Sequence, residues 1–247
     1  MEQEEVHAIN PHDYLSKVQT EVRDTQRAFL LEWIIDVHRK FKLRPETLYV
    51  GQFIIDKFLS KKAIKNTQLH LLGVTTLLIS TKYEEIYPPD LRDLLAVSEN
   101  KFTKTQVLDM EKEILYTLEY NLTAPSAYRF MERFRKLSAH TDDNEVFFYA
   151  QFVLEISLLE ASFLQFKPSY LAAAALILST KQLKKVDCWN KEVQTITGYS
   201  TQDLSEVVKE VRLFCHEINP KFISILKYKF SKPEYMKVSN HEFKFWR

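Results

Sequence analysis

The stretch "LLGVTTLLISTKYEEIYPPD", residues 71–90, begins like the interior of a protein and ends like its surface. Its first half is apolar on nearly every side, and the small residues Gly73, Thr75 and Thr76 allow neighbouring helices to approach closely. The charged run Lys-Tyr-Glu-Glu follows at once, and two consecutive prolines then prevent the helix from continuing. The stretch therefore predicts a central helix, surrounded by others, whose C-terminal end reaches the surface.

A second copy of this helix occurs 99 residues later as "LAAAALILSTK", residues 171–181, without the acidic pair or the prolines. Another segment also recurs: "FTKTQVLDMEKEI" at 102–114 resembles "YSTQDLSEVVKEV" at 199–211, an offset of 97 residues. Two independent matches at nearly one period predict a tandem of two helical units. The units are expected to join near "YNLTAPS", residues 120–126.

Hydrophobic residues at steps of three and four predict five helices in each unit. In the first unit, two helices begin at Asp24 and at Pro45, and three more cover the central stretch, residues 90–97 and residues 104–119. The last of these is opened by a Thr103-x-x-Gln106 capping box. In the second unit they cover 125–138, 144–160, 168–184, 190–197 and 201–217. The predicted fold is all-α, with an N-terminal segment at 1–23 containing a short helix, a first unit at 24–122, a second at 123–228 and a C-terminal extension at 229–247.

Composition favours a helical, soluble, intracellular protein. The chain of 247 residues has only three glycines and is 45% hydrophobic, as expected for two helical domains with few tight turns. Its net charge of +1 gives no general attraction to nucleic acid or to a membrane surface. No apolar signal segment opens the chain, and the longest apolar run, residues 171–178, is far shorter than the roughly 20 residues of a membrane span. Cys188 and Cys215 form no C-x-x-C pattern, so they are expected to be packed thiols.

The sequence carries no recognisable catalytic, metal or cofactor motif. It has no phosphate-binding G-x-x-x-x-G-K loop, no G-x-S-x-G nucleophile elbow and no H-E-x-x-H or paired C-x-x-C spacing. Glu84 and Glu85 are adjacent on a helix and point about 100° apart, so they would not face one substrate. His38, His70 and His216 are isolated and are expected at the surface or in the core. We therefore expect neither catalysis nor a bound cofactor or metal.

Several segments together resemble the cyclin family. "QRAFLLEWIIDV" at 26–37 resembles the signature that opens the first cyclin box, "STKYEEIYPP" at 80–89 resembles its central segment, and "FTKTQVLDMEKEIL" with "YTLEYNLTAPSAYRF" resembles its passage into the second box. The resemblance covers roughly residues 11–230 and is greatest to mitotic A and B types. It implies a non-catalytic subunit, in nucleus and cytoplasm, that binds and activates a cyclin-dependent Ser/Thr protein kinase in cell-cycle control.

The resemblance also implies which residues bind the kinase. In the family, the residues matching Lys82 and Glu111 grip the main chain beside the mobile regulatory helix of the kinase, and an apolar socket surrounds them. The alternative for Lys82 is a solvated helix end paired with Glu84 or Glu85. Lys181 occupies the equivalent place in the second unit and is expected to be a plain surface residue. The predicted kinase-binding residues are Lys82, Glu111, Ile79, Tyr83, Tyr120 and Leu122.

A substrate-docking groove is implied on the first helix. In the family it binds Arg-x-Leu motifs of substrates and inhibitors, with an acidic residue for the Arg and apolar residues for the Leu. Gln26 replaces the usual Met and His70 the usual Gln, which makes this groove more polar. The alternative is that Leu30 and Trp33 are ordinary core residues. The predicted groove residues are Gln26, Phe29, Leu30, Trp33, Asp36, Leu69 and His70.

Four further interpretations stay open at this stage. "RDLLAVSEN", Arg92 to Asn100, has the spacing of a destruction box, but Leu94 and Leu95 are expected to be buried. A DNA-bound adaptor resembling transcription factor IIB would use the same tandem helical fold, although the near-neutral charge opposes it. A cyclin-box scaffold without a kinase partner would differ from the first interpretation only in what it binds. The short segment at 11–22, with Tyr14 and Leu15, offers an apolar face for docking.

Overall fold

The computed structural model describes residues 12–241 and 243, and all regular elements within them are helices. The all-α prediction is therefore confirmed. The chain forms two compact units. The first extends to Ala124 and includes residues 159–165, and the second contains residues 125–158 and the chain from Phe166 onward. Residues 1–11, expected to lack a signal segment, and residues 242 and 244–247 of the predicted C-terminal extension lie outside the described part.

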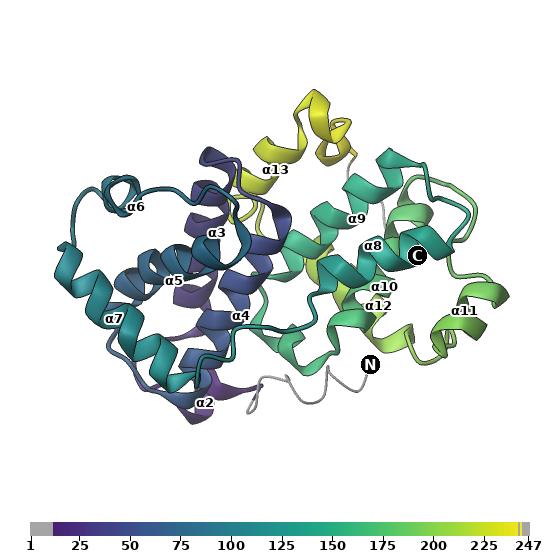
Figure 1. The fold of residues 1–247 in the computed structure, drawn as a ribbon. Helices are drawn as coiled ribbons and strands as arrows, with labels where there is room; N and C mark the ends of the chain where they lie inside the picture. The colour runs from purple at the N-terminus through teal and green to yellow at the C-terminus, as the bar shows by residue number, and fades with distance from the viewer. Residues whose placement is uncertain (1–11, 242, 244–247) are drawn as a thin grey trace. The chain divides into compact units, whose positions relative to one another are not determined.

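In the first unit, α5 is the central helix (Figure 1). It is buried without interruption from residue 72 to residue 81, as its apolar residues on all sides predict. A Cβ atom on Gly73 would lie 2.5 Å from Cδ1 of Leu30, so a larger residue would force this side chain of α3 to shift. The helices of this unit are α2 (Tyr14–Lys17), α3 (Asp24–Lys40), α4 (Pro45–Lys61), η1 (Asn66–Gln68), α5 (Leu69–Glu84), α6 (Leu91–Val97), α7 (Lys104–Thr117) and η2 (Ala161–Gln165).

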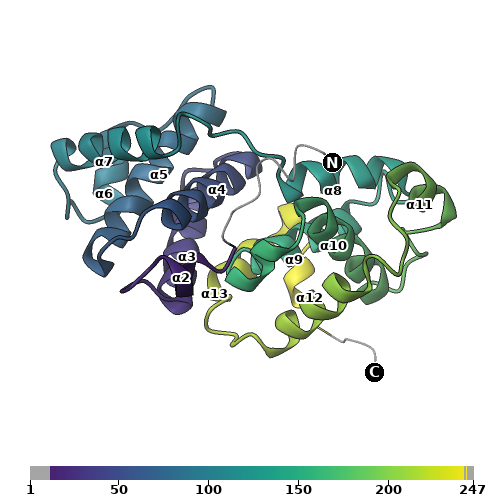
Figure 2. The same ribbon diagram turned by 90° about the horizontal axis from the view of Figure 1, so that it is seen from below.

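In the second unit, α10 takes the same central place, packed against α8, α9 and α12 (Figure 2). Its four consecutive alanines, residues 172–175, are fully buried and let the neighbouring helices come close. The helices are α8 (Ala127–Leu137), α9 (Asn144–Ser157), α10 (Pro168–Gln182), α11 (Lys191–Thr197), α12 (Ser205–Glu217), α13 (Ser224–Phe230), η3 (Pro233–Tyr235) and η4 (Val238–Asn240). The segment predicted as helical from 201 begins its helix only at Ser205, and α13 runs through the predicted boundary at 228/229.

A buried ion pair closes the core of the first unit. Both oxygens of Asp56 accept from the Arg27 guanidinium, each at 2.7 Å, and the two side chains are 0% and 1% exposed. The Tyr14 hydroxyl also donates to Asp56, at 2.7 Å, and Tyr14 is fully buried. Tyr14 is thus committed to its own unit and offers no docking surface, whereas Leu15 is half-buried. The acceptor of this hydroxyl lies 42 residues away in the sequence, so no local pattern indicates the burial of Tyr14.

The second unit repeats the buried carboxylate at the equivalent position. Glu155 lies 99 residues after Asp56, and in both units a glutamine one turn earlier donates to the carboxylate. The cation, however, comes from a different place: Lys229 on α13 donates to Glu155 at 2.6 and 2.8 Å, and both side chains are almost completely buried. The second core is therefore completed by a helix outside the repeated set of five.

Two remaining predictions concern the membrane and the thiols. Within the described residues, none of the helices has the length and apolar character needed to cross a membrane. Cys188 and Cys215 are free and buried, as predicted, and burial raises the pKa of each thiol to about 12. Both thiols are therefore protonated and unreactive near neutral pH.

Candidate functional site

Lys82 and Glu111 meet at the surface of the first unit. Lys82 lies in the last turn of α5, and its Nζ donates to both oxygens of Glu111 on α7, at 2.9 and 3.2 Å. The Thr103–Gln106 capping box begins α7 as predicted, with the Thr103 N–H donating to Gln106 Oε1 at 2.8 Å. The Lys82 side chain is 51% exposed and that of Glu111 is 15% exposed. The predicted pair is thus assembled in the chain by itself and accessible to a partner.

The two acidic residues after Lys82 do not pair with it. The Glu85 carboxylate accepts from the Arg44 N–H at 2.8 Å and from the Thr47 hydroxyl, both at the start of α4. Glu85 leaves the helix with φ −93° and ψ 140°, so α5 ends at Glu84, before the prolines are reached. Glu85 therefore holds the beginning of α4, and the alternative pairing of Lys82 with its acidic neighbours is wrong.

The predicted apolar socket is only partly exposed. Tyr83 and Tyr120 are 47% and 61% exposed, and Leu122 is half-buried. Ile79 is 3% exposed and packs in the core from the central helix, so its assignment as a contact residue stays a prediction. The Tyr83 hydroxyl forms a hydrogen bond with the hydroxyl of Thr123, which fixes the ring beside the pair.

Three exposed apolar residues, two directly after α5 and one near the end of α7, were not predicted from the sequence. Ile86 and Tyr87 are 79% and 91% exposed between the end of α5 and the prolines, and Tyr116 is 69% exposed. Tyr116 packs edge-on against Tyr120 with ring centroids 5.8 Å apart, and desolvation and a hydrogen bond with Tyr116 raise the pKa of Tyr120. The signal available was four tyrosines at the ends of two neighbouring helices. An exposed apolar patch of this kind is typical of an interaction site.

The predicted groove residues fall into three groups. Leu30 and Leu69 are each 6% exposed and pack in the core, so neither lines an open groove. Phe29 is 53% exposed, and Trp33 is half-buried against His70, with ring centroids 4.5 Å apart. The alternative interpretation placed both Leu30 and Trp33 in the core. It is confirmed for Leu30 but not for Trp33, because the Trp33 ring remains partly accessible.

The polar groove residues already have intramolecular partners. Gln26 Oε1 accepts from the Arg23 N–H at 2.7 Å and caps the start of α3. Asp36 pairs with Arg39 and Lys40, each at 2.7 Å; burial opposes its ionisation, but these two cations lower the pKa of its carboxyl. An incoming arginine would have to displace them.

His70 is the exception among these polar residues. Its Nε2 is buried and has no hydrogen-bond partner within the described part of the chain. Burial, reinforced by Lys101, lowers the pKa of His70, so its ring is neutral near neutral pH. The ring presents an unpaired nitrogen beside Trp33 on one side and Phe102 on the other.

Lys181 has an environment different from that of Lys82. It is exposed, and the position matching Glu111 in the second unit is Val208, so Lys181 has no ion-pair partner among the described residues.

The segment from Arg92 to Asn100 contains most of α6, in which Leu94 is fully buried and Leu95 half-buried. The burial predicted there is thus complete only for Leu94. Among the described residues no group of His, Cys, Asp or Glu is arranged to hold a metal ion.

Sequence comparison gives consistent results across the chain. The family model "Cyclin, N-terminal domain" matches residues 1–123, and "Cyclin, C-terminal domain" matches residues 125–244. A soybean (Glycine max) protein named G2/mitotic-specific cyclin S13-7 is 36% identical over 225 residues, covering 91% of this chain and 86% of the relative. Cyclin-B2-1 of Oryza sativa subsp. japonica is 40% identical and cyclin-B1-2 of Arabidopsis thaliana 38%, over 83% and 88% of this chain. The chain spans 48% of the length of each of these two relatives.

Comparison with solved structures supports the fold. A viral cyclin from herpesvirus saimiri superposes with a TM-score of 0.74 at 22% identity, covering 82% of this chain and 90% of that chain. A chain of the yeast RNA polymerase II CTD kinase complex CTDK-1 superposes with a TM-score of 0.67 at 12% identity, covering 83% of this chain and 70% of that chain. At these identities the likeness concerns the arrangement of helices.

Proposed function

The chain belongs to the cyclin family, and we propose that it is the regulatory subunit that binds and activates a cyclin-dependent Ser/Thr protein kinase. Its similarity to relatives named G2/mitotic-specific cyclin and cyclin-B points to a role in the mitotic part of the cell cycle. The chain would contribute geometry to the kinase and no catalytic group of its own. The observation that carries this proposal is the exposed Lys82–Glu111 pair with its border of tyrosines.

The pair suits a grip on the main chain of a partner helix. An ammonium group donates up to three hydrogen bonds and a carboxylate accepts several, so together they can satisfy carbonyl and N–H groups at a helix terminus. Tyr83, Tyr120 and Tyr116 add exposed apolar area next to these polar contacts. A kinase helix held there would be turned toward its active site, where its own Glu pairs with the ATP-binding Lys.

Reconstitution tests this function. The chain is purified alone, and separately used to capture a kinase from the source cell, which is then identified and expressed by itself. We expect no phosphoryl transfer by the isolated chain, low activity of the isolated kinase, and an increase of orders of magnitude when the two are mixed. Phosphoryl transfer by the isolated chain, or capture without any gain in kinase activity, would overturn the proposal.

We further propose that the first unit recruits substrates bearing Arg-x-Leu motifs, through Phe29, Trp33, His70 and Asp36. The burial of Leu30 changes the test, because Leu30→Ala would remove core packing worth about 2–5 kcal/mol and confuse docking with folding. Phe29→Ala alters an exposed side chain instead. It is expected to raise the KM for a substrate bearing the motif and to leave a short peptide without the motif unaffected. Equal losses on both substrates would exclude a docking role.

The transcription-factor-IIB-like alternative is not favoured, because both family models that match are cyclin models and the net charge is only +1. A strongly salt-dependent affinity for duplex DNA would revive it, since phosphate contacts release counterions on binding.

A further inference from the structure

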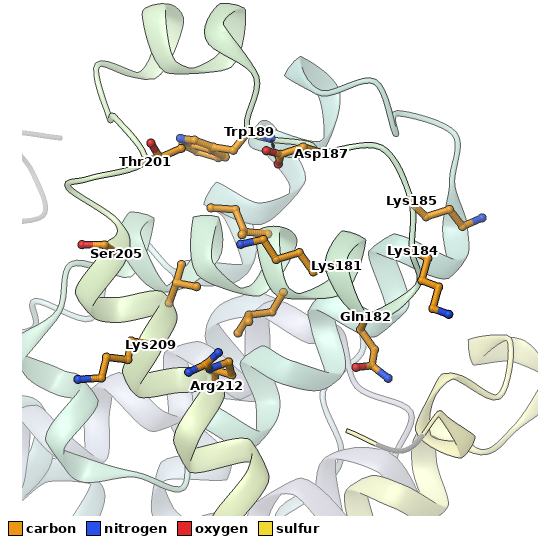
Figure 3. Close-up of a pocket in the computed structure, with 13 residues that line it drawn as sticks. Lys181, Gln182, Lys184, Lys185, Asp187, Trp189, Thr201, Ser205, Lys209 and Arg212 are labelled. Carbon is orange, nitrogen blue, oxygen red and sulfur yellow. Dashed lines mark hydrogen bonds between the residues drawn. The ribbon is translucent and has the colours of Figure 1, made fainter. Parts of the chain in front are cut away.

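The second unit carries an open cleft of about 900 Å³ between the C-terminal end of α10 and the first two turns of α12 (Figure 3). Ser205, Val208, Lys209 and Arg212 line it from α12 at steps of three and four, so they share one helix face. Apolar residues of α10, together with Trp189, form part of the lining. The cleft has the volume typical of a ligand-binding site and combines an apolar surface with a few polar groups.

The charged groups around the cleft are mostly cationic. Lys181 extends from α10 toward the wall formed by α12, whereas Lys185 points away and pairs with Asp143 at 3.2 Å (Figure 3). Among the described residues no carboxylate lies within ion-pairing distance of Lys181 or Lys209. Asp187 is the single acidic residue of the lining, and it accepts from the Trp189 N–H at 3.0 Å.

Comparison with the first unit shows how this cationic site arises. Lys181 matches Lys82, but the position of Glu111 is taken by Val208 and that of Leu115 by Arg212. The second unit therefore loses the carboxylate that neutralises the lysine at the end of the central helix and gains a cation at the same surface. The surface at the end of the central helix is thus a neutralised ion pair in the first unit and a cationic surface, suited to an anionic ligand, in the second.

We propose that this cleft binds a phosphorylated peptide segment, with the phosphate between Lys181, Lys209 and Arg212 and an apolar neighbour of the phosphorylated residue against Val208. The inference rests on the proposed function, because phosphorylated peptides are the products of the partner kinase. A phosphate group carries about two negative charges and three acceptor oxygens, which suits several cations with the Ser205 hydroxyl nearby. Nucleic acid is disfavoured, since the cleft is local and the chain as a whole is nearly neutral.

The test uses the whole chain and a fluorescein-labelled peptide library with four random residues on each side of a phosphothreonine. We expect fluorescence anisotropy to show binding at least about tenfold tighter than to the unphosphorylated library. The double substitution Lys181→Glu and Lys209→Glu should abolish this difference. The matched control is Lys191→Glu with Lys221→Glu, which makes the same change of charge at exposed lysines of the same unit outside the cleft. The control should bind within about twofold of the wild type.

Each other outcome has a defined meaning. Equal binding of the two libraries, or equal loss in the control variant, would overturn the inference, and so would equally tight binding of a library with glutamate in place of phosphothreonine. Competition by a 20-base-pair DNA duplex stronger than by a phosphopeptide would indicate a nucleic-acid site instead. Activation of the captured kinase on a short peptide should be unchanged in both variants. If the Lys181→Glu and Lys209→Glu variant loses phosphopeptide binding but still activates the kinase, this site is distinct from the kinase-binding site. If the proposed function itself is wrong, the wild-type chain will fail to activate the kinase.

Discussion

Removing Lys82 tests the assignment of the partner-binding surface most directly. At a closed interface, each charge-assisted hydrogen bond contributes about 1.5 to 3 kcal/mol. The chain alone already pairs Lys82 with Glu111, and a pair with the lysine half exposed contributes about 0.2 to 1 kcal/mol, which the partner has to replace. The difference leaves about 0.5 to 3 kcal/mol, so Lys82→Ala should weaken kinase binding by about two- to a hundredfold. Glu111→Ala should have a similar effect.

The fold should be nearly unaffected by these substitutions. Losing the pair costs at most about 1 kcal/mol, so the Tm of the first unit should fall by no more than about 8 °C. Kinase affinity is measured by isothermal titration calorimetry for Lys82→Ala and Glu111→Ala, with thermal unfolding of each variant as the control for folding. Lys181→Ala is the matched control, because Lys181 ends the equivalent helix of the other unit. Normal binding of Lys82→Ala, or equal weakening by Lys181→Ala, would refute the assignment of the first unit as the kinase-binding one.

Three further predictions concern stability and pH. Gly73→Ala should lower the free energy of unfolding by about 1 to 3 kcal/mol in urea denaturation, because the added Cβ would lie 2.5 Å from a core side chain. Gly51→Ala should raise the free energy of unfolding by about 0.5 to 1 kcal/mol, because the nearest atom there is 3.6 Å away. Asp56→Asn should cost about 3 to 5 kcal/mol by the same measurement, because it leaves the Arg27 guanidinium buried without a counter-charge and arginine cannot deprotonate; a loss below about 1 kcal/mol would contradict the role of the pair. His70 has a lowered pKa in the folded chain, so protonation favours the unfolded state, and stability should fall as the pH drops below about 6.5, the ordinary histidine value. His70→Gln should flatten this part of the pH profile, and an unchanged profile would show that the ring is not the titrating group.

Local patterns in the sequence predicted most of the helices because each carries its own signals. The capping box at Thr103 and Gln106, the proline that opens α4 and the apolar run of α5 are readable within a few residues. The tandem repeat then predicted the order of helices in the second unit from their order in the first. Helix ends were less accurate where a distant group decides them, as when Glu85 leaves α5 to hold the start of α4.

The candidate site was predictable in its charged centre and less so in its apolar border. Lys82 and Glu111 were assigned to one site because the family resemblance linked them, and the structure brings them together although they lie 29 residues apart. Ile79 and Leu30 were assigned to binding surfaces but are core residues, since helical spacing gives a residue's face and not the depth of its side chain. The burial of Tyr14 and the pairing of Lys229 with Glu155 had no local signal, because each depends on tertiary contacts across 42 and 74 residues.

The different origins of the two buried cations have a consequence for synthesis on the ribosome. Arg27 precedes Asp56 by 29 residues, so the nascent chain already contains the counter-charge when that carboxylate emerges. Glu155 emerges 74 residues before Lys229 and, until then, would be an uncompensated charge in an otherwise apolar core. Because domains generally fold in the order of their translation, we expect the first unit to acquire its charged core early, while the second depends on chaperones until α13 has been made. A released chain that ends between residues 217 and 229 should therefore display a protease-resistant first unit and a protease-sensitive second one.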